Sequence, residues 1–292
     1  MLNQTTITII GIVAYIVLAP LLGGLLAGID RKITARMQGR QGPPILQSFY
    51  DVTKLINKKT FIVNNMQHFL VFSFLIFVIL TGALFFGGFD ILLVFFTLTT
   101  AAMFLVIAAT SANSPYSSMG AQRELAQMLA YEPMVLLAAV GLYMATGSFR
   151  VSDIVQADVS AIAYLPGVFF GFLYILTIKL RKSPFDLSTS HHAHQEMVKG
   201  ISTELSGGVL ALMEVAHWYE NILLLGIVGL FIVNSTWWSV IIAVAVCIVA
   251  YFVEILIDNT SARVKWNLMF KSAWGITIVF GAINILVLQF IK

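Results

Sequence analysis

Ionisable and polar side chains inside long apolar stretches are the groups of this sequence that could do chemistry. Glu214, His217 and Asn221 are spaced i, i+3 and i+7 within the apolar stretch 207–233, with Glu220 beside them. In a helix this spacing places the first three on one face. Acids and histidines embedded in a membrane are costly and serve as proton relays in pumps and transporters. The stripe therefore indicates a proton path, and its structural alternative is hydrogen bonding to neighbouring helices.

Two further carboxylates lie near the ends of apolar stretches. Glu132 precedes Pro133 at the start of the stretch 127–147. It is a candidate for the same path, with simple capping as an equal alternative, because a carboxylate is favoured at the positive end of a helix. Glu254, near the end of the stretch 237–257, is expected to snorkel to the interface or to pair.

The segment 179–206 concentrates polar groups between two apolar stretches. Its acidic and histidine side chains are Asp186, His191, His192, His194, Glu196 and Glu204. His191, His194 and Glu196 are weak candidates for metal ligands, since their spacing matches no defined zinc pattern. A polar surface or a subunit contact is favoured, and no metal is expected in this chain.

Redox cofactors and nucleic acid have no support in the sequence. The single cysteine, Cys247, cannot supply the set of thiolates that an iron–sulfur cluster normally takes. No phosphate loop, dinucleotide-binding glycine fingerprint or nucleophile–base motif occurs. The basic residues lie at the ends of apolar stretches, which does not favour nucleic-acid binding. Any electron carriers are therefore expected in partner subunits.

Most of the chain must lie in a membrane. Of its 292 residues 59% are hydrophobic and 11% are charged, and the mean hydropathy is +0.91, whereas proteins on average carry about 25% charged residues. A helix needs about 20 apolar residues to cross the ~30 Å hydrocarbon layer. Such stretches lie at 7–29, 68–88, 90–112, 127–147, 162–180, 207–233, 237–257 and 272–290. We expect an all-α, polytopic integral membrane protein of about eight transmembrane helices, forming a single domain over residues 1–292.

Positive charge is distributed unequally between the connections. Fifteen of the 17 Lys and Arg residues follow odd-numbered stretches, and only Arg150 and Lys292 fall on the other side. By the positive-inside rule the basic side is cytoplasmic and both termini are extracytoplasmic. The expected cytoplasmic segments are 30–67, 113–126, 181–206 and 258–271.

The first of these segments contains an amphipathic pattern. Apolar residues recur at helical spacing from Ile45 to Ile56, and lysines gather near the end of the range 43–59. The pattern predicts a helix at the membrane interface whose lysines face lipid headgroups or a partner. An ordinary surface helix is an equal alternative.

Four blocks of sequence resemble the complex I subunit 1 family. They are DRKITARMQGRQGP at 30–43, GAQRELAQMLAYEPM at 120–134, PFD at 184–186 with TELSG at 203–207, and the basic connection 263–274. The blocks occur in the family's order, together with eight apolar stretches. The resemblance covers almost the whole of the expected cytoplasmic face.

Departures from complex I point to one branch of that family. Complex I members usually carry a run of acids soon after Pro-Phe-Asp, and here SHHAHQE leaves Glu196 as the match. Glu124 stands where Ala is common, and His217 falls near a usual Glu. The form KSPFDLSTSHHAHQE resembles the small membrane subunit of energy-converting (group 4) membrane-bound nickel–iron hydrogenases. Hydrogenases of this type use ferredoxin or formate-derived electrons without quinone.

The resemblance implies a membrane-anchoring and energy-coupling subunit in the cell membrane of a bacterium or archaeon. Its partners would be the hydrogenase large and small subunits, an iron–sulfur subunit and antiporter-like subunits that move H⁺ or Na⁺. The nickel–iron centre and the iron–sulfur clusters would lie in those partners. The implied coupling path comprises Asp186, Glu196, Glu204, Glu132, Glu214 and His217. The residues that would dock the hydrophilic arm or orient the acids are Arg36, Arg40 and Arg123.

Two other functions stay open on the sequence. The nearer is a quinone-binding subunit 1 of a complex I-type NADH dehydrogenase. The other is an autonomous ion transporter, which the polar stretch 207–233 alone would permit.

Overall fold

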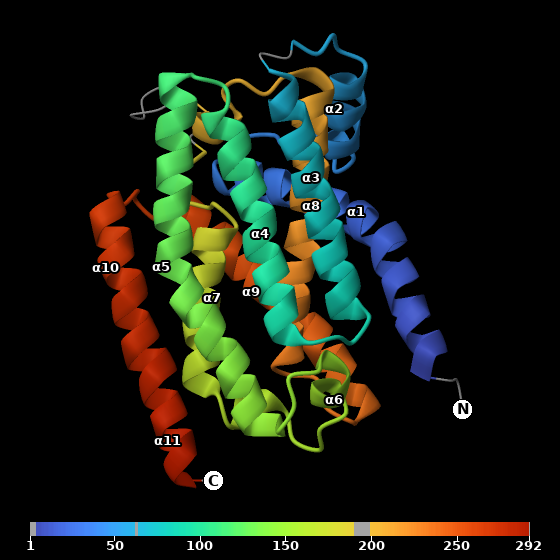
Figure 1. Cartoon of the computed structure of the whole chain (residues 1–292), viewed down its shortest axis with the longest axis vertical. Helices are drawn as coiled ribbons and strands as arrows, with labels where there is room; N and C mark the ends of the chain where they lie inside the picture. The colour runs from blue at the N-terminus through green and yellow to red at the C-terminus, as the bar shows by residue number, and fades with distance from the viewer. Residues whose placement is uncertain (1–3, 62–63, 190–198, 292) are drawn as a thin grey trace.

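The computed structural model describes residues 4–61, 64–189 and 199–291, and its regular structure over these ranges is helical (Figure 1). The elements are α1 Gln4–Met37, α2 Gln47–Ile56, α3 Asn65–Phe86, α4 Ile91–Thr110, α5 Pro115–Thr146, α6 Val151–Val155, η1 Ala161–Ala163, α7 Pro166–Lys179, η2 Gly200–Ser202, α8 Gly207–Leu230, α9 Trp237–Thr260, α10 Trp266–Ile276, η3 Thr277–Ala282 and α11 Ile283–Ile291. No strand occurs over the described ranges, where the one isolated bridge joins Asp90 and Arg150. The all-α prediction is confirmed.

Among the described residues seven helices are long and apolar enough to cross a membrane. They are α1, α3, α4, α5, α8, α9 and the continuous run from α10 through η3 to α11. The eighth expected span, 162–180, contains the shorter apolar helix α7. It begins only at Pro166, because proline fits the first turn of a helix but breaks one that is already running. The polytopic membrane fold is as predicted, with this one span shortened.

Two helices extend into the segments between the apolar stretches. α1 continues to Met37, and α5 begins at Pro115, well before residue 127 where its apolar stretch starts. The polar residues from Gln122 to Gln127 interrupt the hydropathy but are good helix formers. Hydropathy therefore finds the membrane part of α5 and misses its polar first turns, which occupy most of the segment 113–126.

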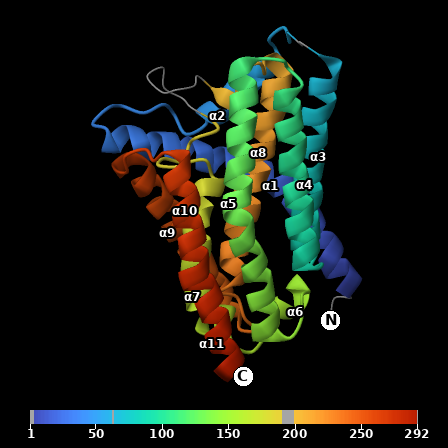
Figure 2. The same cartoon turned by 60° about the vertical axis from the view of Figure 1, so that its left-hand side comes forward.

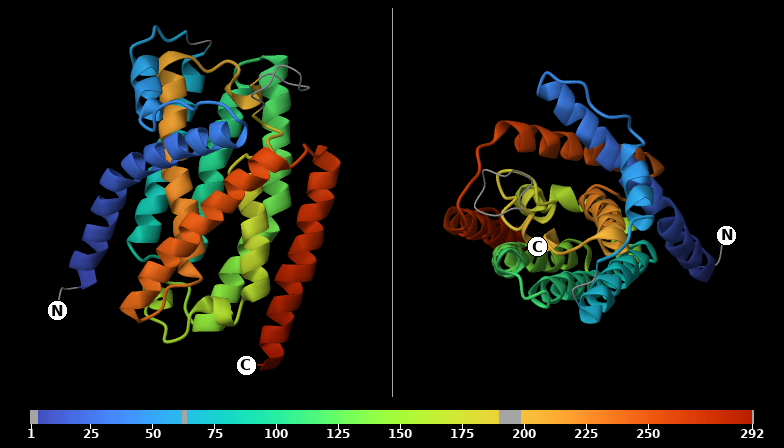
Figure 3. Two further views of the ribbon diagram at one scale, coloured as in Figure 1. Left: turned by 180° about the vertical axis from the view of Figure 1, so that it is seen from behind. Right: turned by 90° about the horizontal axis from the view of Figure 1, so that it is seen from above.

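The helices form an upright bundle with two tilted members. Figure 1 places both termini toward the end of the bundle opposite α2. α3, α4, α5 and α8 stand side by side, whereas α1 bends across the back of the bundle and α9 runs obliquely (Figure 3). The run from α10 to α11 packs on the outside of α5 and α7 (Figure 2).

The amphipathic helix expected within 43–59 is present as α2. Val52 is buried on this helix and packs with Ala211 and Trp218 of α8. Ile56, which the apolar pattern would place on the packed face, is 63% exposed, and Leu55 packs in its place. α2 thus packs against α8 through one narrow face. Its lysine, Lys54, and the following Lys58 and Lys59 are exposed.

The outer faces of the bundle are strongly apolar. Side chains at least 50% exposed include Val13, Leu21, Ile241, Ile248 and Val279. A soluble protein does not expose contiguous apolar faces of this kind, whereas a membrane protein turns them toward lipid.

α1 approaches α8 so closely that it depends on a glycine. A Cβ added at Gly23 would overlap the carbonyl oxygen of Trp218, which belongs to rigid helical backbone. We expect Gly23→Ala to lower the free energy of unfolding by about 1–3 kcal/mol, as overpacking does. Thermal unfolding of the detergent-solubilised protein measures this. Gly275→Ala is the matched control, because no atom lies within 4 Å of a Cβ built there. Equal unfolding midpoints for the two variants would contradict the close crossing.

Candidate functional site

The C-terminal end of α7 is the structural starting point of the site. α7 has 14 residues, so it spans only about 21 Å, less than the ~30 Å of a hydrocarbon core. The following residues 180–189 are not helical, yet Lys182, Phe185 and Asp186 are buried. Seen from above, this segment lies inside the ring of helices (Figure 3). Irregular backbone at membrane depth is tolerated only where protein or a hydrated cavity surrounds it.

A residue in the left-handed backbone conformation directs side chains of this segment to both sides of α7. Arg181 has φ of 52°, a conformation that costs a non-glycine residue energy and persists only when its surroundings fix it. Its side chain points to α5 and α8, and Lys182, the next residue, points to α1 and α9. Two polar clusters result, one on each side of the end of α7.

The first, here called the Lys179 cluster, comprises Glu124 and Tyr131 of α5, Lys179 and Arg181, and His217 and Glu220 of α8. Arg181 donates two hydrogen bonds to the Glu124 carboxylate, from Nη2 to Oε1 at 2.6 Å and from Nε to Oε2 at 3.2 Å. Its Nη1 lies 2.7 Å from His217 Nε2 and 4.0 Å from Glu220 Oε2. Burial alone would lower the pKa of Arg181, but Glu124 and Glu220 raise it above its ordinary value, so the guanidinium stays charged.

Lys179 completes the cluster from the last turn of α7. Its Nζ lies 3.2 Å from Glu220 Oε1 and donates a hydrogen bond to the Tyr131 hydroxyl at 3.0 Å. The side chains of Lys179 and Glu220 are 7% and 5% exposed. Two cations thus neutralise two carboxylates out of contact with water. Such an arrangement is weak evidence for stability, because desolvation offsets most of the attraction, and it suggests a functional reason for keeping the charges.

The second, here called the Asp30 cluster, joins α1, α9 and the segment after α7. Lys182 Nζ lies 2.7 Å from Asp30 Oδ2 and 4.7 Å from the centre of the Tyr251 ring. The Tyr251 hydroxyl donates to the same Asp30 oxygen at 3.3 Å. The backbone N–H of Ser183 donates to Asp258 Oδ1 at 2.8 Å, which ties the segment to the end of α9.

Asp186 follows a few residues later and is bound by an arginine. Arg263 donates to its two carboxylate oxygens at 2.8 and 2.6 Å. Burial raises the pKa of Asp186 above its ordinary value, against the lowering effect of Arg263. The carboxylate therefore holds the connection between α9 and α10 onto the segment after α7.

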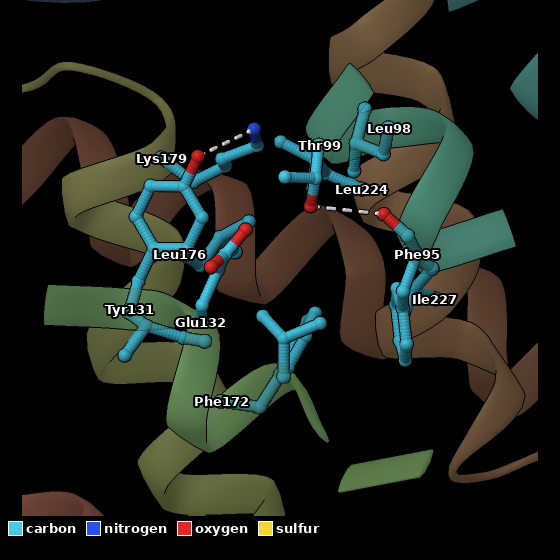
Figure 4. A pocket seen from close by; sticks show the side chains of 12 residues that line it. Phe95, Leu98, Thr99, Tyr131, Glu132, Phe172, Leu176, Lys179, Leu224 and Ile227 are labelled. Carbon is cyan, nitrogen blue, oxygen red and sulfur yellow. Dashed lines mark hydrogen bonds between the residues drawn. The ribbon is translucent and has the colours of Figure 1, made fainter. Parts of the chain in front are cut away.

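A small cavity adjoins the Lys179 cluster on its membrane side. Its volume is about 20 Å³, enough for one water molecule. Figure 4 shows the Glu132 carboxylate pointing into it, with Tyr131 and Lys179 at one edge and Thr99 opposite. No hydrogen bond or ion pair joins the Glu132 side chain to another described residue. Glu132 and the Lys179 cluster therefore share one cavity.

The structure divides the polar stripe of α8. His217 enters the Lys179 cluster together with Glu220, which the sequence placed only beside the stripe. Glu214 is half-buried one turn closer to the start of α8. Capping does not describe Glu132, because α5 begins at Pro115 and residue 132 is in its interior.

The other residues singled out on the sequence are not members of the two clusters. Arg36 and Arg40 are exposed at the end of α1, and Arg40 Nε donates to Gln38 at 2.9 Å. Arg123 and Glu204 are half-buried. Glu196, His191 and His194 lie outside the described residues. Over the described ranges no three His, Cys, Asp or Glu side chains are grouped so as to hold a metal ion.

Sequence reasoning missed several members of the clusters. Lys179, Arg181 and Lys182 entered only as cytoplasmic charges, and Glu124 only as a departure from a family pattern. The three basic residues and the one carboxylate border apolar stretches among other polar residues, which is ordinary at the end of a span. Only the fold shows that they point inward.

Comparison with known proteins gives consistent matches over nearly the full length. The family model described as NADH dehydrogenase matches residues 9–289. An NADH-quinone oxidoreductase subunit of Carboxydothermus hydrogenoformans is 30% identical over 314 aligned residues, covering 97% of this chain and 88% of that protein. Hydrogenase-4 component C of Escherichia coli is 26% identical, covering 89% and 90%. A chain of the membrane-bound sulfane sulfur reductase, an archaeal respiratory membrane complex, superposes with a TM-score of 0.83 over 96% of this chain and 99% of that chain. At 22% identity this last match concerns the fold alone.

Proposed function

This chain belongs to the NADH dehydrogenase family, and we propose that it couples a membrane-bound nickel–iron hydrogenase to ion translocation. Its relatives make it a multi-pass membrane subunit of a complex I-like respiratory complex. The finer assignment is to the energy-converting hydrogenase branch. In that role the chain docks the hydrophilic hydrogenase arm and links ferredoxin-dependent H₂ metabolism to transport of H⁺ or Na⁺.

The observation that carries the proposal is the Lys179 cluster at the end of α7, a helix too short to span a membrane. Its four charges connect α5, α7 and α8, and its lysine borders the cavity that holds Glu132. A network of buried charges can exchange partners when one charge nearby changes, which lets a distant event move a proton. Such a device suits a coupling subunit better than a simple anchor.

Charge displacement would begin in the segment 180–189. The arm is proposed to dock at the end of the bundle that carries α2 and this segment, which is also the basic and hence cytoplasmic end. A redox change in the arm would shift this segment and weaken the pairing of Lys179 with Glu220. Lys179 can then turn toward Glu132, which borders the same cavity, and the proton balance of both carboxylates changes.

Several roles from the sequence become part of this proposal. Asp186, Glu196 and Glu204 are proposed to begin the path, and Glu132, Glu214 and His217 to continue it. Arg36, Arg40 and Arg123 contact the arm or orient the acids. The redox centres belong to the hydrogenase large and small subunits and an iron–sulfur subunit, and antiporter-like subunits move the ions. The complex is proposed to lie in the cell membrane, with both termini of this chain outside.

The hydrogenase branch rests on two further observations. The chain resembles Hydrogenase-4 component C over most of both lengths. The departures KSPFDLSTSHHAHQE and Glu124 set it apart from the complex I pattern, and Glu124 is the carboxylate that pairs with Arg181. The residue that departs from complex I is thus a central member of the cluster.

One observation favours a quinone-binding subunit instead. A groove of about 960 Å³ lies between α1, α8 and α9, and its apolar lining includes Leu22, Ile222 and Val244. Such a groove can take the tail of a quinone, and it can equally take a lipid acyl chain. The similarity to an NADH-quinone oxidoreductase subunit also supports the quinone-binding alternative.

Purification of the intact complex through a tag on this chain separates the two functions. We expect nickel to co-purify in a constant ratio and reduced ferredoxin to drive H₂ evolution. Nickel analysis and gas chromatography measure the two. A nickel-free complex that reduces quinone with NADH would establish the alternative. Ion flux through the isolated chain in vesicles would instead indicate an autonomous transporter.

A further inference from the structure

Glu254 is a buried carboxylate that the proposed path does not use. It lies on α9, one helical turn before Asp258, and is 2% exposed. The Thr177 hydroxyl of α7 donates to its Oε1 at 3.2 Å. Its Oε2 is buried and has no hydrogen-bond partner among the described residues. The sequence predicted that Glu254 would snorkel to the interface or form an ion pair. Among the described residues it does neither.

The charges around Glu254 are already engaged elsewhere. Lys182, the cation that faces Glu254, pairs with Asp30 at 2.7 Å. Asp258 accepts from the backbone of Ser183. The groups that face Glu254 are thus Thr177 from α7, Lys182 from the segment after α7, and Asp258 on its own helix. None of them forms an ion pair with it.

An ionised carboxylate in this position would be poorly compensated. Burying a charge without a partner costs several kcal/mol or more, whereas a neutral carboxylic acid is far cheaper to bury. One hydroxyl donor at Oε1 serves the carbonyl oxygen of a neutral acid and leaves Oε2 to carry the proton. The contacts therefore fit the protonated form.

We propose that Glu254 is a proton-binding site that exchanges its proton with the cytoplasmic end of the protein through Asp258. In the transfer the O–H bond on Asp258 breaks and an O–H bond forms on Glu254 Oε2, leaving Asp258 as a carboxylate. Asp258 is half-buried near the end of α9 and lies on the same helical face. The step is a proton transfer alone and needs no redox partner.

The position of Glu254 gives this proton a role. The segment after α7 carries Arg181 of the Lys179 cluster and, next to it, Lys182 and Ser183, which hold Asp30 and Asp258. A shift of the segment that alters the first cluster therefore alters the surroundings of Asp258 and Glu254 as well. Glu254 would take up or release a proton to compensate charge displaced in the Lys179 cluster. This role rests on the proposed coupling function, whereas proton binding itself does not.

Infrared spectroscopy of the purified complex tests proton binding directly. The spectrum of wild type near neutral pH should contain a carboxylic-acid C=O band that is missing in Glu254→Gln. Thr177→Val should keep the band and move it to higher wavenumber, because the donated hydrogen bond is lost. Asp158→Asn, which changes an exposed carboxylate at the other end of the bundle, should leave the band unchanged.

An infrared band that persists in Glu254→Gln, or whose wavenumber Thr177→Val does not change, would overturn the assignment of the proton to Glu254.

The proposed role of Glu254 in charge compensation has a separate measurement, the number of ions taken up by vesicles per H₂ formed. Glu254→Gln should lower this ratio by about half, because glutamine keeps the hydrogen bonds but cannot change charge. If Glu254→Gln loses the infrared band but keeps the ratio of ions to H₂, Glu254 binds a proton but does not take part in coupling. A complex without nickel would refute the hydrogenase function while leaving the infrared result intact.

Discussion

Arg181→Met is expected to destabilise the protein by about 3–5 kcal/mol, because it leaves the buried Glu124 carboxylate without its cation. Glu124 is 4% exposed, and all its ion-pair contacts over the described ranges come from Arg181. His217 and Glu220 would lose a neighbour as well. The unfolding midpoint of the detergent-solubilised chain and the yield of assembled complex measure the effect.

The double variant Arg181→Met with Glu124→Ala provides the decisive comparison. If the loss arises from an uncompensated charge, removing the carboxylate should restore most of the stability. Glu220 keeps its own partner, Lys179, in the double variant. Arg40→Met is the control for loss of an exposed arginine and should leave the midpoint within about 0.5 kcal/mol of wild type. A double variant as unstable as Arg181→Met would show that packing of the arginine, and not charge, is what matters.

Glu132→Gln is expected to have the largest effect on coupling with the smallest effect on folding. Its carboxylate points into the cavity beside Lys179 and pairs with no other described residue, so glutamine should fit without loss of stability. Glutamine cannot bind or release a proton, so we expect ion uptake per H₂ to fall by about tenfold. H₂ formation without coupling should continue, because the proposed metal centre lies in a partner subunit.

Vesicles that contain the complex allow both quantities to be measured on one preparation. Ion uptake is followed with a pH- or Na⁺-sensitive dye while H₂ is measured in the gas phase. Gln127→Glu is unsuitable as a control, because Gln127 donates to the Phe185 carbonyl at 2.5 Å inside the protein. Asp158→Asn is suitable, since its carboxylate is exposed. An unchanged ion uptake per H₂ in Glu132→Gln would show that Glu132 and its cavity are not part of the coupling path.

The fold was largely predictable from the distribution of apolar residues. Lipid imposes a length of about 20 apolar residues on a spanning helix, so hydropathy locates such helices without knowledge of their neighbours. The helical spacing of the apolar residues also predicted the amphipathic helix α2. Hydropathy failed at α5, whose polar first turns extend beyond the membrane part, and at α7, where Pro166 delays the start. Both errors concern the start of a helix, because a helix can begin with polar residues before the apolar stretch, and an apolar stretch can begin before the helix does.

The candidate site was predictable only in part. Glu132 and His217 were found on the sequence because each interrupts an apolar stretch, and both adjoin the Lys179 cluster in the fold. Lys179, Arg181 and Lys182 looked like ordinary cytoplasmic charges, since basic residues at the end of a span need no explanation. The non-helical segment that follows α7 and the left-handed conformation of Arg181 direct them into the protein.

Local composition and short motifs were enough to assign the class of the protein, the rough positions of its spans and its resemblance to one family. The pairing of the charges, in contrast, follows from the packing of the helices. Glu124 meets Arg181 across 57 residues, and Lys182 meets Asp30 across 152. Among the described residues Glu254 forms no ion pair, because Lys182, the cation that faces it, is held by Asp30. Pairing depends on distances of a few ångström between residues far apart in the chain, and only the packed helices set those distances.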